Sequence, residues 1–144
     1  MPTLPHLLPS VQVSVSVATD RQRLFQMLTV AEYMEAWLAV PELSTDSHVT
    51  VTSAPDCFRI DHFRSRQADF SITAQYRMCR RGKIQFSWRK DCGHGSASSL
   101  VLIRLCGDFG RTTVVLRHTL LSSSEQAWHQ DLWENSLRKL QLLF

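Results

Sequence analysis

The stretch "WHQDLWENSLRKLQLLF" (residues 128–144) constrains the fold more than any other part of the sequence. Its apolar side chains recur at intervals of three and four, which is the spacing of one face of an α-helix. They are Trp128, Leu132, Trp133, Leu137, Leu140 and Phe144. Because such a stripe must be buried, the rest of the chain has to form a concave apolar surface around this helix. The preceding "SSSEQ" (122–126) predicts a capping box, in which Glu125 or Gln126 reaches back toward a serine.

A series of strands precedes this helix and can supply that surface. "VQVSVSV" (11–17) alternates valine with polar residues, which is the period of a half-buried strand. The same alternation occurs in "HVTVTS", "CFRIDHF", "DFSITAQYRM", "KIQFSWRK", "SSLVLIRLC" and "TTVVLRHT". Short connections such as "APD", "RRG" and "GDFGR" separate most of these segments, so we expect about seven strands in an antiparallel sheet.

The segment between the first two strands has helical spacing instead. "ATDRQRLFQMLTVAEYMEAWL" (18–38) predicts two short helices that end near Pro41. There is no internal repeat and no linker, so we expect residues 11–144 to form one domain. Residues 1–10 contain three prolines and neither Lys nor Arg, which predicts a flexible tail and not a secretory signal.

The composition is that of a globular protein, with 44% hydrophobic and 20% charged residues, and this excludes wholesale disorder. No apolar run approaches the length that spans a bilayer. The four cysteines, Cys57, Cys79, Cys92 and Cys106, include no C-x-x-C pair, which favours reduced thiols over a zinc site or a disulfide scaffold. We therefore expect a cytoplasmic protein.

The order of these elements resembles the helix-grip fold of the SRPBCC superfamily, which includes the START lipid-transfer domains and relatives of the birch-pollen allergen. Within it, the likeness is to the branch named for activators of a heat-shock-protein ATPase. The segments that carry it are "ATDRQRLFQMLTVAEYMEAW" (18–37), "KIQFSW" (83–88), "RTTVVLRHTLL" (111–121) and "LWENSLRKL" (132–140). The resemblance implies an α+β fold in which a curved antiparallel sheet of about seven strands grips the long C-terminal helix. It also implies a cavity between sheet and helix that takes an apolar or amphipathic small molecule.

Strand alternation selects the residues that face this interior. His62 shares a face with Ile60, Tyr76 with Ile72 and Met78, and His118 with Val114 and Leu116. We also expect Trp88 and Trp133 to face each other across sheet and helix. The predicted ligand-binding residues are Trp37, Ile60, His62, Ile72, Tyr76, Phe86, Trp88, His118, Trp133 and Leu137. The alternative interpretation of both histidines is a neutral ring whose hydrogen bonds are satisfied within the protein.

Three functions are compatible with these residues, and we favour a noncatalytic binder or carrier of a small hydrophobic molecule such as a lipid. A polyketide cyclase or dehydratase-like enzyme would use the same cavity. His62, His118 and Tyr76 are then the inward acid–base candidates, with no inward Asp or Glu beside them. The sequence has no nucleophile-elbow motif, and His62 with His118 would lack a third close metal ligand. We expect neither a metal nor another cofactor.

The third function is a protein-interaction module, similar to a co-chaperone. Residues 59 to 90 contain nine basic side chains against Asp61 and Asp69, whereas the remainder of the chain is net acidic. Arg59, Arg77 and Arg89 have outward parity and are compatible with an acidic protein partner, although we favour the interpretation that they form a solvated outer face. No nucleic-acid-binding motif accompanies the charge. A homodimer is left open.

Overall fold

A computed structural model describes residues 9–39, 47–91 and 98–144 of the chain. Its elements follow the predicted order of one strand, two short helices, six strands and a long helix. They are β1 (Val11–Val17), α1 (Arg21–Thr29), α2 (Ala31–Trp37), β2 (Ser47–Ala54), β3 (Cys57–Arg64), β4 (Gln67–Arg80), β5 (Lys83–Asp91), β6 (Ser99–Asp108), β7 (Arg111–Thr119) and α3 (Ser123–Leu142). Most of the predicted N-terminal tail lies outside the described residues, so its flexibility stays a prediction.

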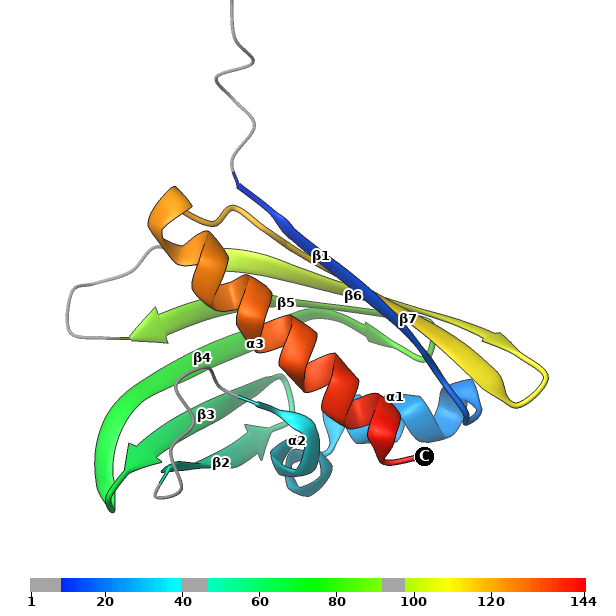
Figure 1. Cartoon of the computed structure of the whole chain (residues 1–144), viewed down its shortest axis with the longest axis horizontal. Coiled ribbons are helices and arrows are strands. Elements are labelled where there is room, and N and C mark those ends of the chain that lie inside the picture. The colour runs from blue at the N-terminus through cyan, green and yellow to red at the C-terminus, as the bar shows by residue number, and fades with distance from the viewer. Residues whose placement is uncertain (1–8, 40–46, 92–97) are drawn as a thin grey trace, which may run out of the picture.

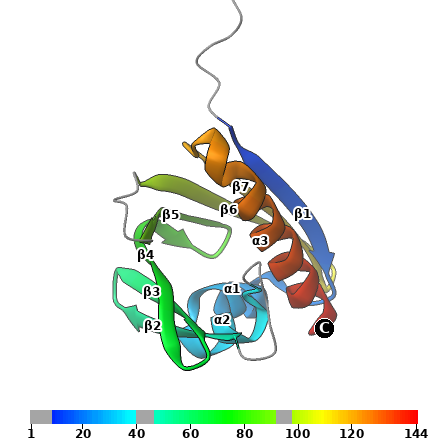
Figure 2. The ribbon, with the colours of Figure 1, turned by 60° about the vertical axis from the view of Figure 1, so that its left-hand side comes forward.

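The seven strands form one antiparallel sheet in the order β1-β7-β6-β5-β4-β3-β2. The sheet curls, and α3 lies diagonally across its concave side (Figure 1). In the turned view, β2, β3 and β4 curve round the interior, while α1 and α2 lie near the C-terminal end of α3 (Figure 2). The predicted α+β helix-grip architecture is therefore confirmed.

The apolar stripe of α3 is buried as the sequence predicts, and polar residues interrupt it. Leu132, Trp133, Leu137 and Leu140 are at most 1% exposed. His129 and Ser136 are buried on the same face, and the Ser136 hydroxyl accepts a hydrogen bond from the backbone N–H of Ala39 at 2.9 Å. Trp128 is only partly buried. Phe144, which we placed on the stripe, follows the last helical residue and is 37% exposed.

The predicted capping box at the start of α3 is wrong. Ser122 is the N-cap residue, but its side chain makes no capping hydrogen bond; its hydroxyl lies 3.1 Å from that of Ser124. The two side chains expected to reach back have other partners. The Gln126 amide donates to the Ser10 carbonyl at 3.1 Å, and a Glu125 carboxylate oxygen lies 3.7 Å from His129 Nδ1.

Two irregularities in β4 change which side chains face the interior. Near Tyr76, the register slips so that Met78 pairs with Gln85 and Cys79 pairs with Ile84. Directly paired residues share a face, so Met78 is on the outer face and not on the inner face with Tyr76, as strict alternation predicted. One extra residue in a strand reverses the parity of all that follow.

The second irregularity lies where β3 meets the start of β4. His62 pairs with Phe70, but the next residue, Phe63, pairs with Ala68. Asp69 is therefore the extra residue of a bulge. This local distortion places Asp69 next to His62 and becomes important for the candidate site.

Among the described residues, no helix is both long and apolar enough to cross a membrane. Cys57, Cys79 and Cys106 are free thiols, and Cys92 lies outside the described residues.

Candidate functional site

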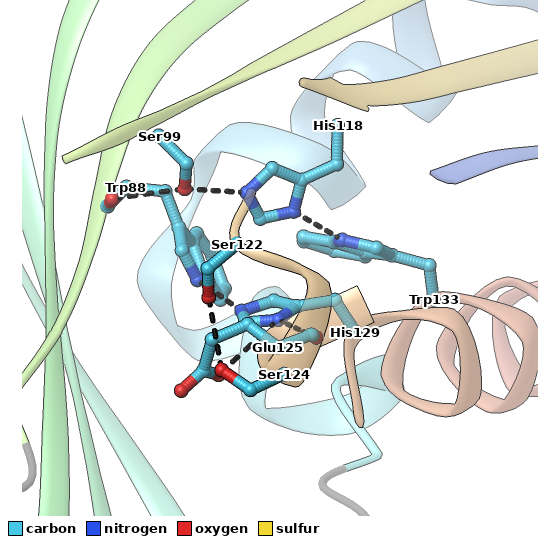
Figure 3. A network of polar contacts seen from close by, with 8 residues as sticks. All are labelled: Trp88, Ser99, His118, Ser122, Ser124, Glu125, His129 and Trp133. Carbon is cyan, nitrogen blue, oxygen red and sulfur yellow. Dashed lines mark hydrogen bonds and ion pairs between the residues drawn. The ribbon is translucent and has the colours of Figure 1, made fainter. Parts of the chain in front are cut away.

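His118 lies at the centre of a hydrogen-bond network between sheet and helix (Figure 3). The indole N–H of Trp133 donates to His118 Nδ1 at 3.0 Å, so this nitrogen carries no hydrogen in the neutral ring. His118 Nε2 then donates to the Ser99 hydroxyl at 2.6 Å, and that hydroxyl donates to the Trp88 carbonyl at 3.1 Å. Both ring nitrogens of His118 therefore have protein partners.

His129, which the sequence analysis did not select, completes the network from α3. Its Nε2 accepts the indole N–H of Trp88 at 3.0 Å, and its Nδ1 donates to the Glu125 carbonyl at 2.7 Å. The ring centroids of His118 and His129 are 4.7 Å apart with the rings nearly perpendicular. In the sequence, a polar residue at a position of the apolar helical stripe is the signal that could have identified His129.

Burial keeps both histidines neutral. It lowers the pKa of His118 to about 3, and the neighbouring His129 adds to the effect. Burial also lowers the pKa of His129; the hydrogen bond to Glu125 and the charge of its carboxylate oppose this shift, and Lys90 supports it. The centroids of Trp88 and Trp133 are 5.1 Å apart, so the predicted pairing across sheet and helix is confirmed. Trp88, His118, His129 and Trp133 thus form a cluster between β5, β7 and α3 whose ring nitrogens all have hydrogen-bond partners, and we call this cluster the clamp.

A different arrangement surrounds His62 on β3. Its side chain is 0% exposed, and its Nδ1 lies 3.1 Å from the carboxylate oxygen Oδ2 of Asp69. Its other ring nitrogen, Nε2, is buried and has no hydrogen-bond partner among the residues that the structure describes. Alternation alone did not place a carboxylate beside His62; the bulge brings that of Asp69, which is 38% exposed, into contact with the buried ring.

Aromatic side chains and a lysine surround this pair. Phe70 stacks on the His62 ring with centroids 4.8 Å apart, and Trp128 of α3 meets Phe70 edge-on at 5.6 Å. The ammonium of Lys90 lies 3.6 Å from the Trp128 ring centroid and 5.0 Å from that of Phe70. The sequence analysis did not select Phe70, Lys90 or Trp128 as site residues. Phe70 was missed because only the strand register brings it opposite His62.

Within the described part of the chain, the phenolic oxygen of Tyr76 is also buried without a hydrogen-bond partner. Phe58 and Phe86 pack around its ring, with centroids at 5.5 and 6.0 Å. Burial, with a smaller contribution from Cys79, raises the pKa of Tyr76 well above its usual value, so the phenol keeps its hydrogen. Tyr76 is six residues beyond Phe70 along β4, which corresponds to about 20 Å of strand.

The remaining predicted site residues supply apolar surface. Ile60, Ile72, Phe86 and Leu137 are all at most 4% exposed. Trp37 is 2% exposed, and its indole N–H donates to the Met27 carbonyl of α1 at 2.6 Å. The structure thus places the predicted residues in the interior. Their role in binding a ligand stays a prediction.

Asp69 also reaches the outside of the sheet. Its side chain is 38% exposed and lines a hollow of about 340 Å³ together with Arg59, Asp61, Ser71 and Asp91. One carboxylate therefore contacts both the outer surface and the buried ring of His62. The described residues include no cluster of three or more side chains that could hold a metal ion.

The outer face carries a row of basic residues that the sequence analysis did not single out. Lys83 pairs directly with Arg80 on β4 and with Arg104 on β6. By contrast, Arg59 makes a 2.9 Å ion pair with Asp61 on its own strand. A second hollow, of about 230 Å³, lies beside the row and is lined by Gln12, Leu102, Arg104, Val115 and Arg117.

The curved sheet that grips a C-terminal helix defines the helix-grip fold of the SRPBCC superfamily. The sequence gives the narrower assignment. The family model described as "Activator of Hsp90 ATPase homolog 1-like protein" matches residues 18–144, and the chain belongs to this family. No curated protein matches the sequence significantly.

Solved structures agree on the fold. A protein from Chromobacterium violaceum superposes with a TM-score of 0.79 at 13% identity, covering 94% of this chain and 96% of its own. CalU16 from Micromonospora echinospora superposes with a TM-score of 0.67 at 15% identity, and the match covers 92% of this chain and 74% of CalU16. DynU16, from the dynemicin biosynthetic locus, gives 0.69 at 15% identity, covering 93% of this chain and 46% of DynU16. At such identities the likeness shows the fold alone.

Proposed function

We propose that this protein binds a small amphipathic molecule between the concave face of the sheet and α3. The observation that carries the proposal is the pair of buried polar atoms without partners, His62 Nε2 and the Tyr76 hydroxyl. Leaving such an atom unsatisfied costs about 1–3 kcal/mol. A bound molecule that supplies the missing hydrogen bonds recovers this free energy.

The proposal divides the predicted site residues into two groups. His62 or Tyr76, which lie about 20 Å of strand apart, makes the polar contact with a small ligand, and Ile60, Ile72 and Phe86 contact its apolar part. The histidine and tryptophan side chains of the clamp make no polar contact with it, since protein groups satisfy their nitrogens. Binding without chemical conversion is the simplest function of such a site.

Filling the interior tests this proposal. Ala74 is 0% exposed on the inner face of β4, whereas Thr73, the residue before it, is exposed on the outer face. Ala74→Leu should weaken binding of the uncharged fluorescent probe N-phenyl-1-naphthylamine at least tenfold, and Thr73→Leu should leave it unchanged. Circular dichroism is the check that both variants fold. A wild-type protein that does not bind the probe, or equal binding by both variants, contradicts the proposal.

An enzyme similar to polyketide cyclases or dehydratases is a second candidate, and the His62–Asp69 pair favours it. A histidine held by a carboxylate, with its other nitrogen buried and unpartnered in the described part of the chain, is an arrangement typical of general acid–base catalysis. The enzyme predicts that His62→Gln abolishes turnover of an aromatic polyketide-like substrate while the protein stays folded. Full turnover by that variant contradicts it.

A protein-interaction function is favoured by the basic row on the outer face. Arg80, Lys83 and Arg104 lie directly opposite one another, and like charges in this arrangement destabilise a sheet. None of the three has an ion-pair partner within the described part of the chain. An acidic protein surface would supply the missing negative charge, whereas the predicted contact at Arg59 competes with Asp61.

Two double variants distinguish these basic surfaces. Lys83→Glu with Arg104→Glu should abolish binding to an oligoglutamate peptide at low salt. Arg59→Glu with Arg77→Glu should reduce it less. If the second pair has the larger effect, the sequence-based choice of residues is correct and the basic row is not the binding surface.

A further inference from the structure

The hydrogen bond between His62 and Asp69 fixes which ring nitrogen meets a ligand. An ionised carboxylate can only accept, so the hydrogen on the ring lies at Nδ1, 3.1 Å from Asp69 Oδ2. In the neutral ring, Nε2 is then a hydrogen-bond acceptor. This acceptor is buried, and no group of residues 9–39, 47–91 and 98–144 donates to it.

Packing also fixes the direction of this acceptor. The His62 ring is stacked on Phe70 with an interplanar angle of 28°, and Phe70 is held by the edge of Trp128. A ring that is stacked on one side and hydrogen-bonded through Nδ1 has little freedom to turn. Its Nε2 is therefore a preorganised contact for one atom of a ligand.

We propose that the molecule bound in the interior carries a phenolic or enolic hydroxyl that donates its hydrogen to His62 Nε2. This inference rests on the binding function proposed above and names the chemical class of its ligand. A ketone, ether or ester would offer only an acceptor to the acceptor Nε2. A carboxylate likewise has no hydrogen to donate to Nε2.

The same geometry gives a route for the proton of that hydroxyl. As its O–H bond breaks, the electron pair stays on the ligand oxygen and a new N–H bond forms at His62 Nε2. The hydrogen on Nδ1 can then pass to Asp69 Oδ2, 3.1 Å away. Because the Asp69 side chain is 38% exposed in the outer hollow, it can exchange that proton with water. The bulge thus connects a buried acceptor with solvent through the sheet.

A pair of probes that differ in one hydrogen-bond donor tests the inference. 2-Naphthol has a phenolic hydroxyl, and 2-methoxynaphthalene has nearly the same apolar body without a donor. One hydrogen bond to the buried acceptor predicts that the wild-type protein binds 2-naphthol about tenfold more tightly. Titrations followed by tryptophan fluorescence give both dissociation constants.

Variants assign this preference to His62. His62→Phe should bind both probes equally, and the control His48→Phe, an exposed histidine on the outer face of β2, should keep the tenfold preference. Asp69→Asn leaves the buried ring in place but no longer dictates its tautomer, so the preference should fall. This variant decides the question if His62→Phe does not fold.

The outcomes separate the inference from the proposed function. If the wild-type protein binds both probes equally, the inference is overturned and the binding function stands. If it binds neither probe, the binding function itself fails. A preference that survives in both His62→Phe and Asp69→Asn shows that another group accepts the hydroxyl, and this also overturns the inference.

Discussion

Replacement of Trp133 by alanine tests how α3 is held in the sheet. The side chain is 1% exposed, packs against Trp88 and donates to His118 Nδ1. Truncating a fully buried tryptophan to alanine costs about 3–5 kcal/mol through lost burial and the cavity that remains. The acceptor left on His118 adds about 1–3 kcal/mol unless water replaces the donor. We therefore expect a loss of about 4 kcal/mol or more, a large part of the 5–15 kcal/mol that stabilises a typical domain.

Two further variants identify the source of this loss. Trp133→Phe keeps an aromatic ring but removes the donor, so its cost should lie between that of wild type and alanine. Trp128→Ala removes a tryptophan that is only partly buried on the same helix, and should cost less than half as much. Urea denaturation followed by circular dichroism measures all three free energies of unfolding. Equal losses for Trp133→Ala and Trp128→Ala, or a loss below about 1 kcal/mol for Trp133→Ala, would refute the clamp.

Two other predictions concern the histidines. Burial lowers the pKa of His118 to about 3 and also lowers that of His129, so below about pH 6.5 the unfolded chain binds protons that the folded chain excludes. The free energy of unfolding measured in urea should therefore fall between pH 7 and pH 5, by at most about 1.4 kcal/mol per pH unit for each histidine, and less steeply in His118→Gln; a free energy of unfolding independent of pH in the wild type contradicts this. Long-range proton–nitrogen NMR should find hydrogen on Nδ1 of His62 and on Nε2 of His118, and the opposite tautomer at His62 would remove the basis of its proposed role.

Periodicity was sufficient to predict the architecture, because apolar residues alternate along each strand and recur every three or four positions along each helix. The valines of β1 and the stripe of α3 each specify one buried face, and burying them together requires a sheet curved around a helix. The same alternation correctly brought Trp88 opposite Trp133. These inferences depend only on which face a residue occupies, and a sequence contains that information.

Contacts that depend on strand register could not be predicted in this way. Strict alternation has no means of locating the bulges of β4, so it placed Met78 on the inner face and left Asp69 away from His62. His129 was missed for another reason. Its position on α3 follows the apolar stripe, but its partner Trp88 lies 41 residues earlier in the chain and becomes visible only in the fold.

Buried polar atoms with hydrogen-bond partners and those without them lie in different parts of the sheet. This separation suggests that one part stabilises the fold and the other binds the ligand. The ring nitrogens of Trp88, His118, His129 and Trp133, between α3 and the β5–β7 half, have hydrogen-bond partners, whereas the two unpartnered side-chain atoms found among the described residues lie on β3 and β4. If the orphaned atoms are kept for a ligand, removing one should cost no stability in the unliganded protein. Tyr76→Phe should then melt at or above the temperature of the wild type while binding its ligand more weakly. Marked destabilisation by Tyr76→Phe would show that the hydroxyl has a structural partner, and would withdraw it from the binding site.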